Sequence, residues 1–265
     1  MKNQTSTMNN IHPTAIIDDT AAIDDTAIIG AYCIIGKNVK IGAHTVLKSH
    51  VIVGDNTTIG QHNEIYQFAS VGEVPQDLKF AGEETFLEIG DYNRIRESCT
   101  LHRGTKDGGG LTKIGNHNLF MVNTHIAHDC MVGDYNILAN NVGVAGHAHI
   151  GNHIIVGGQS GIHQFCHIDD YSMIGGGSII VKDVAAFVTI SGNPAQTHGI
   201  NKEGMRRKGW SAQTIQNLDK AYRIAFRSSL LKDEVLIELD KLLSDEPKIA
   251  LLIQSIQKSK RGLIK

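Results

Sequence analysis

Two histidines, a carboxylate, an amide and a glycine recur at a fixed separation in the middle of this chain. His128, Gly146 and Gln164 follow one another at one constant interval, and the same interval joins Asp129 to His147. Near pH 7 a neutral imidazole can accept a proton from a hydroxyl, a carboxylate can orient that imidazole, and a glycine N–H can stabilise an oxyanion. Acyl transfer to a hydroxyl needs these groups. The candidate cluster comprises His125, His128, Asp129, Gly146, His147, His163 and Gln164.

The same residues admit two other interpretations. The histidines could be solvated side chains on an outer surface of the protein. Alternatively, His125, His128 and His147 could hold zinc between neighbouring subunits, as in the γ-class carbonic anhydrases. A zinc site would leave the basic C-terminal segment described below without a purpose. We therefore expect no metal in this cluster.

A six-residue repeat positions the cluster. Aliphatic residues occupy every sixth position over 11–71 and 89–101, and again over 114–180 after a slip of one residue, with Phe120 as the exception. A period of six fits neither an α-helix nor a single alternating strand. It fits a three-sided parallel β-helix in which each hexad forms one side and three hexads form one coil. About ten coils, roughly 4.8 Å apart, would make a column roughly 45–50 Å long.

Residues separated by three hexads should be neighbours in successive coils. His128 and Gly146 have this separation. It places Gly146 next to His128 in one column, followed by Gln164, and it places His147 next to Asp129 in the adjacent column. Glycine often follows the aliphatic residue of a hexad, as in Ile29-Gly30. We expect these glycines to adopt backbone angles at the corners that other residues resist.

Two segments interrupt the repeat, and loops of this kind can carry function. Residues 73–88 interrupt it without changing the frame, whereas residues 103–113, with three consecutive glycines, cause the slip of one residue. The four cysteines each occupy the fifth position of a hexad, which normally holds a small inward-facing residue. We expect them to be free thiols in the core, because free cysteine packs as a small hydrophobe. They are Cys33, Cys99, Cys130 and Cys166.

The repeat ends near Pro194, and the C-terminal segment reads as helical. Ser211 can cap one helix, a second is expected near 233–243, and a third after Pro247. We therefore divide the chain into a polar extension (1–10), a β-helix (11–193) and a helical domain (194–265). The helical domain carries 14 Lys+Arg against 8 Asp+Glu, and the rest of the chain 11 against 19. A basic module on an acidic body suits an acidic protein partner.

Net charge and N-terminal composition exclude further classes of protein. A formal net charge of −2 argues against a nucleic-acid binder. The polar N-terminus carries no apolar run, so we expect neither a signal peptide nor a membrane span. We therefore expect a cytoplasmic protein.

Nine short motifs connect the chain to a known family. They are NEIYQFAS at 63–70, QDLK at 76–79, RIRE at 94–97, HRGT at 102–105, HIAHD at 125–129, AGH at 145–147, HQFC at 163–166, NKEG at 201–204 and RGLI at 261–264. In these motifs the chain closely resembles the UDP-N-acetylglucosamine O-acyltransferases, which catalyse the first step of lipid A synthesis. The resemblance covers nearly the whole chain apart from the first ten residues. It implies a left-handed parallel β-helix with a C-terminal α-helical domain.

The resemblance also implies an activity and an assembly. The family transfers an (R)-3-hydroxyacyl group from acyl carrier protein to the 3-hydroxyl of UDP-N-acetylglucosamine. It uses no metal and no cofactor of its own, because the acyl group arrives on the phosphopantetheine of the carrier. Its active sites lie between the subunits of a homotrimer. Acyl carrier protein is acidic, which gives the basic helical domain a purpose.

The resemblance assigns roles residue by residue. His128 corresponds to the general base, Asp129 to its support, and the N–H of Gly146 to the oxyanion donor. The residues expected to line the nucleotide-sugar and acyl sites are Gln76, Asp77, Lys79, His125, His147, His163 and Gln164. Those expected at the UDP end are Asn201, Glu203 and Arg207, followed by Lys208. At Lys208 the family commonly has arginine, and lysine cannot form a bidentate fork to phosphate.

Acyl-chain length in the family depends on a residue at the end of a cleft between coils. Gly176, close to Met173, matches that position. A missing side chain leaves the cleft long and favours longer hydroxyacyl chains, unless Gly176 is simply another corner glycine.

Two further classes are compatible with a hexapeptide repeat. The related N-acyltransferases carry an additional N-terminal uridine-binding domain, for which the start of the hexads at Ile11 leaves no room. Acylation of an amine at the 3-position of the sugar stays open. A purely structural or ligand-binding solenoid would favour regular threonine arrays on one face and would not need the helical domain.

Overall fold

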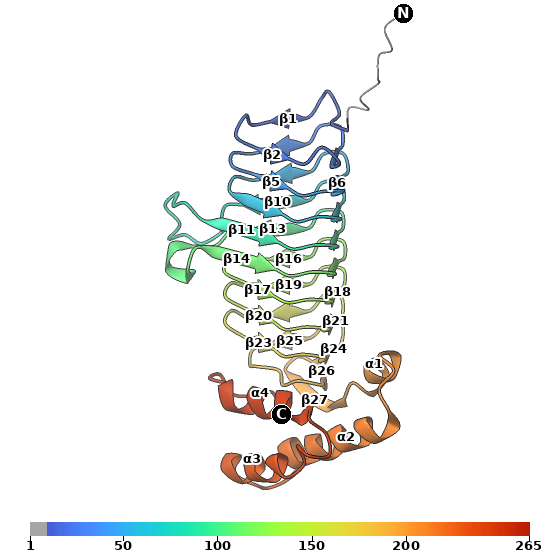
Figure 1. Cartoon of the computed structure of the whole chain (residues 1–265). Helices are drawn as coiled ribbons and strands as arrows, with labels where there is room; N and C mark the ends of the chain where they lie inside the picture. Colours follow the sequence, from blue (N-terminus) through green and yellow to red (C-terminus); the bar gives the residue numbers. More distant parts are fainter. Residues whose placement is uncertain (1–9) are drawn as a thin grey trace, which may run out of the picture.

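The computed structural model describes residues 10–265, so the expected N-terminal extension lies, except for Asn10, outside the described residues. The chain folds as a left-handed parallel β-helix whose C-terminal end is closed by helices (Figure 1). Three sheets form the sides of the prism and contain nine, eight and ten strands. Within residues 10–265, no helix combines the length and the hydropathy needed to cross a bilayer.

Each sheet receives every third strand of the chain until the last two strands, which both join the ten-stranded sheet. The nine-stranded sheet comprises β1 (Ile16–Ile17), β4 (Ile34–Ile35), β7 (Ile52–Val53), β10 (Ser70–Glu73), β13 (Thr100–His102), β16 (His125–Ile126), β19 (Gly143–Val144), β22 (Gly161–Ile162) and β25 (Ile179–Ile180). The eight-stranded sheet comprises β2 (Ala22–Ile23), β5 (Lys40–Ile41), β8 (Thr57–Ile59), β11 (Phe86–Ile89), β14 (Leu111–Ile114), β17 (Met131–Val132), β20 (His149–Ile150) and β23 (His167–Ile168). The ten-stranded sheet comprises β3 (Ile28–Ile29), β6 (Val46–Leu47), β9 (Glu64–Ile65), β12 (Arg94–Ile95), β15 (Leu119–Phe120), β18 (Ile137–Leu138), β21 (Ile155–Val156), β24 (Met173–Ile174), β26 (Val188–Gly192) and β27 (Ala195–Ile200).

Three edges join these sheets. We name them by one residue each: the His128 edge joins the nine- to the eight-stranded sheet, the Lys208 edge joins the eight- to the ten-stranded sheet, and the Gly176 edge joins the ten- to the nine-stranded sheet.

Inward aliphatic side chains hold the coils together. In most strands the second residue is buried and the first faces outward, as in β4, where Ile34 is exposed and Ile35 is buried. Neighbouring strands pair residues that are three hexads apart, as in Ile34 against Ile52, which confirms the predicted coil. The four cysteines are free and buried. Burial raises the pKa of Cys99 to about 11 and that of Cys130 to about 12, as expected for core thiols.

The expectation for the corner glycines holds at Gly72 (φ 87°) and Gly177 (φ 68°) but was wrong for most glycines that follow an aliphatic residue. The residues with positive φ at the turns are mostly Asn, His, Tyr and Phe, for example Asn38 (φ 55°) and His44 (φ 57°). Gly30 and Gly42, which follow aliphatic positions, have no such φ. A Cβ on Gly42 would lie 2.7 Å from the carbonyl carbon of Gly60. These glycines are therefore required by the close approach of successive coils rather than by backbone conformation.

Both interruptions leave the prism at the His128 edge. Val71 pairs with Leu101 rather than with Ile89, so the first loop lengthens one coil by two hexads. Thr100 pairs with His125 rather than with Asn118, so the second loop lengthens the next coil by one hexad and one further residue. The second loop contains a 3-10 turn, η1 (Lys106–Gly108). The two loops project side by side from the prism in Figure 1.

The C-terminal domain contains four helices: α1 (Lys202–Arg207), α2 (Ala212–Arg227), α3 (Lys232–Asp240) and α4 (Ile249–Lys258). Ser211 caps α2 by accepting a hydrogen bond from Thr214 N, as predicted, and α1 was not predicted. The sheet runs past the boundary expected at residue 193, because β27 pairs antiparallel with β26. Tyr222 of α2 donates a hydrogen bond to Thr197 of β27 (3.2 Å), which docks the helices on the last coil.

Candidate active site

His128 and Asp129 form a hydrogen-bonded pair at the His128 edge. The His128 Nδ1 lies 2.8 Å from Asp129 Oδ2. A carboxylate can only accept, so Nδ1 carries the proton and Nε2 is left with a free lone pair. The Asp129 side chain is 1% exposed, and that of His128 is 17% exposed. The pair therefore presents an accessible imidazole whose tautomer is set by a buried carboxylate.

Gly146 lies beside His128 on the next coil, as the separation of one coil predicted. His147 N donates a hydrogen bond to His128 O (3.0 Å), which fixes the two coils in register. A Cβ on Gly146 would lie 2.8 Å from His128 Nε2, so only glycine leaves room for this imidazole. Within residues 10–265, the Gly146 N–H donates to no acceptor.

The second loop surrounds the Asp129 carboxylate. Thr105 donates two hydrogen bonds to it, from N to Oδ1 (2.8 Å) and from Oγ1 to Oδ2 (2.6 Å). The backbone N of Asp129 donates to Thr112 Oγ1 (2.8 Å). A Cβ on Gly108 would lie 2.0 Å from the carboxylate carbon. Sequence reasoning missed these residues; the signal was present in the HRGT motif and in the glycines of the loop.

Two more histidines lie next to the pair. His125 Nδ1 is 2.7 Å from Thr100 Oγ1, and its ring meets the ring of His102 edge to face at 4.9 Å. Burial lowers the pKa of His102 to about 4 and, together with the charge of His128, lowers the pKa of His125. Both rings are therefore neutral near pH 7. His102 was absent from the predicted site residues, although it begins the HRGT motif.

The ligand atoms of His128, Asp129 and His147 lie within 4.8 Å of one another, a separation that could also suit a metal ion. The expected zinc alternative used His125 rather than Asp129, so the structure groups a different set. Both carboxylate oxygens of Asp129 already accept hydrogen bonds from Thr105 and His128. His147 Nε2 is 3.8 Å from Oδ2, beyond hydrogen-bond distance. The contacts of the carboxylate are thus those of an imidazole-orienting group.

The other residues expected around the base lie along the same edge. His163 and Gln164 are exposed, and Arg261 of the C-terminal segment approaches His163 Nδ1 at 3.5 Å. Asp77 Oδ1 accepts a hydrogen bond from Lys79 N (2.9 Å) in a turn of the first loop. Gln76 is exposed in the same loop, and Lys79 is too. The structure thus brings one group of predicted residues to one edge: Gln76, Asp77, Lys79, His125, His128, Asp129, Gly146, His147, His163 and Gln164.

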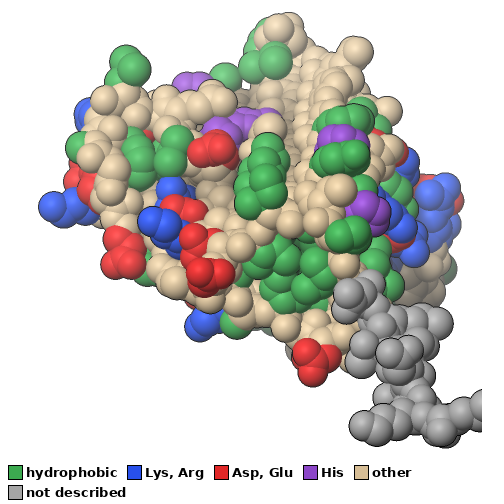
Figure 2. Space-filling view, turned by 90° about the horizontal axis from the view of Figure 1, so that it is seen from above, with side chains coloured by type: hydrophobic (Ala, Val, Ile, Leu, Met, Phe, Trp, Pro, Cys, Tyr) green, Lys and Arg blue, Asp and Glu red, His purple; other side chains and the backbone are tan. Residues whose placement is uncertain are grey.

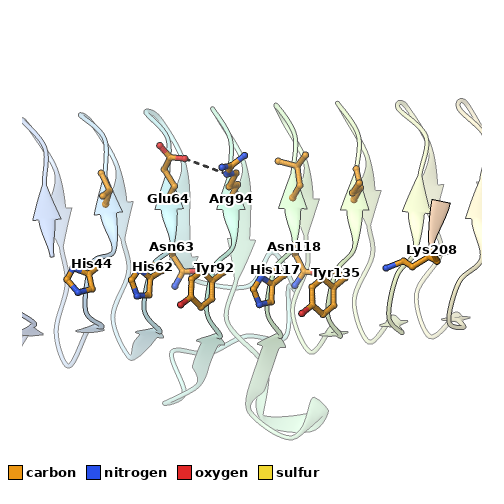
Figure 3. Close-up of a pocket in the computed structure, with 13 residues that line it drawn as sticks. His44, His62, Asn63, Glu64, Tyr92, Arg94, His117, Asn118, Tyr135 and Lys208 are labelled. Atoms are coloured by element: carbon orange, nitrogen blue, oxygen red, sulfur yellow. Dashed lines mark ion pairs between the residues drawn. The ribbon is translucent and has the colours of Figure 1, made fainter. Parts of the chain in front are cut away.

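An open groove of about 690 Å³ lies along the Lys208 edge. A column of stacked rings runs along this edge, with neighbouring centroids 4.6–4.9 Å apart over His44, His62, Tyr92, His117, Tyr135, His153 and Tyr171. The rings from His44 to Tyr135 form one wall of the groove. Figure 3 shows five of these rings in a row, with Lys208 at one end and the Glu64–Arg94 ion pair on the neighbouring strands. Lys208 Nζ donates to His153 Nδ1 (2.7 Å) and lies 5.7 Å from the Tyr135 ring centroid.

The four residues expected at the UDP end belong to α1 and its flanks. Asn201 caps α1 by accepting from Gly204 N (3.0 Å), and its amide donates to Tyr171 O (3.2 Å). Glu203 pairs with Arg207 on the exposed side of the helix (3.0 Å). Asn201 therefore already has a structural role within the chain, whereas Glu203, Arg207 and Lys208 are not buried.

The two residues expected to set acyl-chain length lie at a third place. Gly176 is exposed in the turn after β24 at the Gly176 edge, and Met173 faces outward on β24 of the ten-stranded sheet. A Cβ on Gly176 would lie 3.3 Å from Gly158 O. The predicted site residues are thus spread over all three edges of the prism.

Coils built from three six-residue repeats and carrying an imidazole–carboxylate pair define a hexapeptide-repeat transferase, and comparisons with known proteins agree. A family model described as bacterial transferase hexapeptide (six repeats) matches residues 32–67 and 111–146. A second model, described as UDP N-acetylglucosamine O-acyltransferase, domain 2, matches residues 183–264.

Individual relatives narrow the class. The chain is 70% identical over 204 residues to the acyl-[acyl-carrier-protein]–UDP-N-acetylglucosamine O-acyltransferase of Psychrobacter cryohalolentis, covering 77% of this chain and 79% of the relative. It is similar to the crystal structure of UDP-N-acetylglucosamine O-acyltransferase (LpxA) from Moraxella catarrhalis, with 73% identity, a TM-score of 0.96 and coverage of 97% and 100% of the two chains. LpxA from Acinetobacter baumannii gives 62% identity, a TM-score of 0.95 and the same coverage. The chain belongs to the UDP-N-acetylglucosamine O-acyltransferase family.

Proposed function

We propose that this protein transfers an (R)-3-hydroxyacyl group from acyl carrier protein to the 3-hydroxyl of UDP-N-acetylglucosamine, the first step of lipid A synthesis. The observation that carries the catalytic part is the His128–Asp129 hydrogen bond of 2.8 Å, with Nε2 beside Gly146. The names of relatives about 70% identical to this chain support the substrates.

The reaction follows from these groups. Nε2 of His128 removes the proton of the sugar hydroxyl while its oxygen attacks the thioester carbonyl carbon. The N–H of Gly146, which has no acceptor within residues 10–265, stabilises the oxyanion. The C–S bond then breaks, and the thiol of the carrier leaves with the proton held by His128. No step requires a metal or a cofactor bound by this chain.

The active unit is a homotrimer with sites between subunits. One reason is the spread of the predicted residues. The base lies at the His128 edge, and Gly176 lies at the edge named after it. Lys208, which follows α1, contacts His153 at the Lys208 edge. A single substrate reaches all three only if neighbouring chains bring different edges together. A second reason is an exposed apolar row on the nine-stranded sheet, formed by Ile16 (67% exposed), Ile34 (44%) and Ile52 (41%) in register. Figure 2 looks down on the N-terminal end of the prism, where β1 lies, and shows exposed hydrophobic side chains there.

In this assembly the basic helical domain receives the acidic carrier, and Asn201, Glu203, Arg207 and Lys208 hold the UDP end. Gln76, Asp77, Lys79, His125, His147, His163 and Gln164 line the sugar and acyl sites. Both substrates are expected in the cytoplasm, which is the location we assign to the enzyme.

Mass spectrometry of the product tests the proposal. Purified protein with UDP-N-acetylglucosamine and (R)-3-hydroxyacyl carrier protein should give an O-acylated sugar nucleotide. His128→Ala should lower kcat by about 10²–10⁴-fold, the usual contribution of a general base. A matched control is His12→Ala, an exposed histidine of the first coil whose Nδ1 lies 2.9 Å from Thr14 Oγ1. Absence of product with wild type, or full activity of His128→Ala, would contradict the proposal. A 3-amino acceptor in parallel distinguishes O- from N-acylation.

A further inference from the structure

The second loop (103–113) lengthens one coil, and its contacts converge on one carboxylate. Thr105 is the N-cap of η1, and its side chain accepts from Gly108 N (3.2 Å). The O–H of the same hydroxyl donates a hydrogen bond to Asp129 Oδ2 at 2.6 Å. Its backbone N–H donates to the other oxygen, Oδ1, at 2.8 Å. A single residue therefore holds both oxygens of the group that orients His128.

We propose that Thr105 is a positioning residue that fixes the Asp129 carboxylate and, through it, the tautomer and orientation of the His128 imidazole. This inference rests on the proposed acyl transfer with His128 as base. Oδ2 is shared between the Thr105 hydroxyl and His128 Nδ1. When His128 takes the proton of the acceptor hydroxyl it becomes an imidazolium, and the carboxylate must stay aligned with Nδ1–H at that moment.

Burial makes the Thr105 bonds irreplaceable by water. The Asp129 side chain is 1% exposed, and Thr105 itself is buried at 7% exposure. If the hydroxyl were removed, Oδ2 would lose a donor that solvent cannot easily supply. The carboxylate would then keep the backbone N–H at Oδ1 and could rotate about it.

Gly108 closes the other side of the carboxylate. A Cβ there would lie 2.0–2.4 Å from the Cγ and both oxygens of Asp129. The close approach explains a glycine at this position, since any side chain would displace the carboxylate. Gly108 of the loop thus packs against the Asp129 carboxylate, and Thr105 donates hydrogen bonds to it. The one-residue slip of the repeat marks the segment that makes this contact.

Two substitutions separate the hydroxyl from the shape of the residue. Thr105→Val keeps the volume and removes Oγ1, whereas Thr105→Ser keeps Oγ1 and removes a methyl group. We expect Thr105→Val to lower kcat about ten- to a hundred-fold, the range for losing a hydrogen bond to a charged group, with KM for UDP-N-acetylglucosamine changed by no more than about twofold. Thr105→Ser should restore kcat to within about threefold of wild type. Thr124→Val is the matched control, since it removes a buried hydroxyl bonded to Met121 O (2.8 Å) at the Gly176 edge.

A double-mutant cycle with Asp129→Asn tests whether Thr105 acts through the carboxylate. If it does, Thr105→Val should cost less than about threefold in kcat on the Asp129→Asn background, although it costs ten-fold or more on wild type. A merely structural role of Thr105 would give the same loss on both backgrounds.

The outcomes are distinct. Inactive wild type with both natural substrates would remove the proposed function itself. Active wild type with an equally active Thr105→Val, or with independent effects in the cycle, would overturn the role of Thr105 alone. Thermal melting of each variant shows whether it is folded. If Thr105→Val is unfolded, the kcat of Thr105→Ser still tests the role of Thr105. A kcat within about threefold of wild type supports a role of the hydroxyl, and a larger loss contradicts it.

Discussion

His128 Nε2 and the Cα of Gly146 face each other across neighbouring coils so closely that a Cβ on Gly146 would lie 2.8 Å from Nε2 and 2.6 Å from Cε1. The expected base and the expected oxyanion donor therefore share one small volume. The backbone conformation does not restrict Gly146 to glycine, because its φ is not positive. The three atoms nearest to a Cβ at this position all belong to the His128 imidazole.

Gly146→Ala should disable the enzyme while leaving the prism intact. The added methyl group must displace the imidazole, and overpacking of this kind costs about 1–3 kcal/mol. If that cost falls on the transition state, kcat drops about ten- to a hundred-fold. Steady-state kinetics and circular dichroism check the prediction. Gly143→Ala is the matched control, because a Cβ there meets no atom within 4 Å. A fully active Gly146→Ala would show that His128 does not need its observed position.

Gly176 should influence the preferred acyl chain. A longer side chain at this exposed turn would shorten any cleft that ends there, so Gly176→Met should shift the preference towards shorter hydroxyacyl chains. Competition between acyl carrier proteins of different chain length, read by mass spectrometry, measures the shift. Gly176→Ala is an intermediate case, since its Cβ would lie 3.3 Å from Gly158 O. If wild type and Gly176→Met prefer the same chain, the role of Gly176 and Met173 in chain length is wrong.

The apolar row on the nine-stranded sheet should be covered in the assembly. Ile34 lies in the middle of the row, between Ile16 and Ile52 in register. Placing a charge there would bury an unpaired ammonium in any interface, which is costly. Ile34→Lys should therefore dissociate the trimer, seen by light scattering as a fall in mass from three times 28.8 kDa to 28.8 kDa. Lys40→Glu, on the eight-stranded sheet, is the control. A trimer unaffected by Ile34→Lys would place the interface elsewhere.

His102 should make stability depend on pH. Burial lowers the pKa of His102 from 6.5 to about 4, so the unfolded chain binds its proton more readily than the folded chain. Stability is then fully present above about pH 6.5 and is lost as the pH falls towards 4. Urea unfolding at several pH values in this window should show the loss, and His102→Gln should reduce its slope. An unchanged slope in the variant would assign the acid sensitivity to other groups.

Much of this site was readable from the sequence because the fold is periodic. In a parallel β-helix every residue has a neighbour one coil away, so a separation of three hexads becomes contact without knowledge of the fold's details. The stacking of His128 on Gly146 and of Asp129 near His147 followed in this way. The placement of Cys99 and Cys130 in the core followed from their position in the hexad.

The departures from the period could not be read in the same way. The glycines after the aliphatic residues were correctly located but wrongly explained, because the spacing between coils, and not φ, excludes a side chain at Gly42. The contact of Lys208 with His153 joins a helix flank to the repeat, across a change from one kind of structure to another. No periodic rule reaches across such a change.

The sequence by itself determined the coil, the column of His128 and the basic character of the C-terminal domain, since these depend only on residue type and spacing. Only the tertiary structure decided that Thr105 and Gly108 enclose the Asp129 carboxylate. It also decided that the predicted site residues occupy three separate edges of the prism. The physical reason is that a loop outside the repeat obtains its position from packing and hydrogen bonds, which the order of residues does not reveal until the coils are in place.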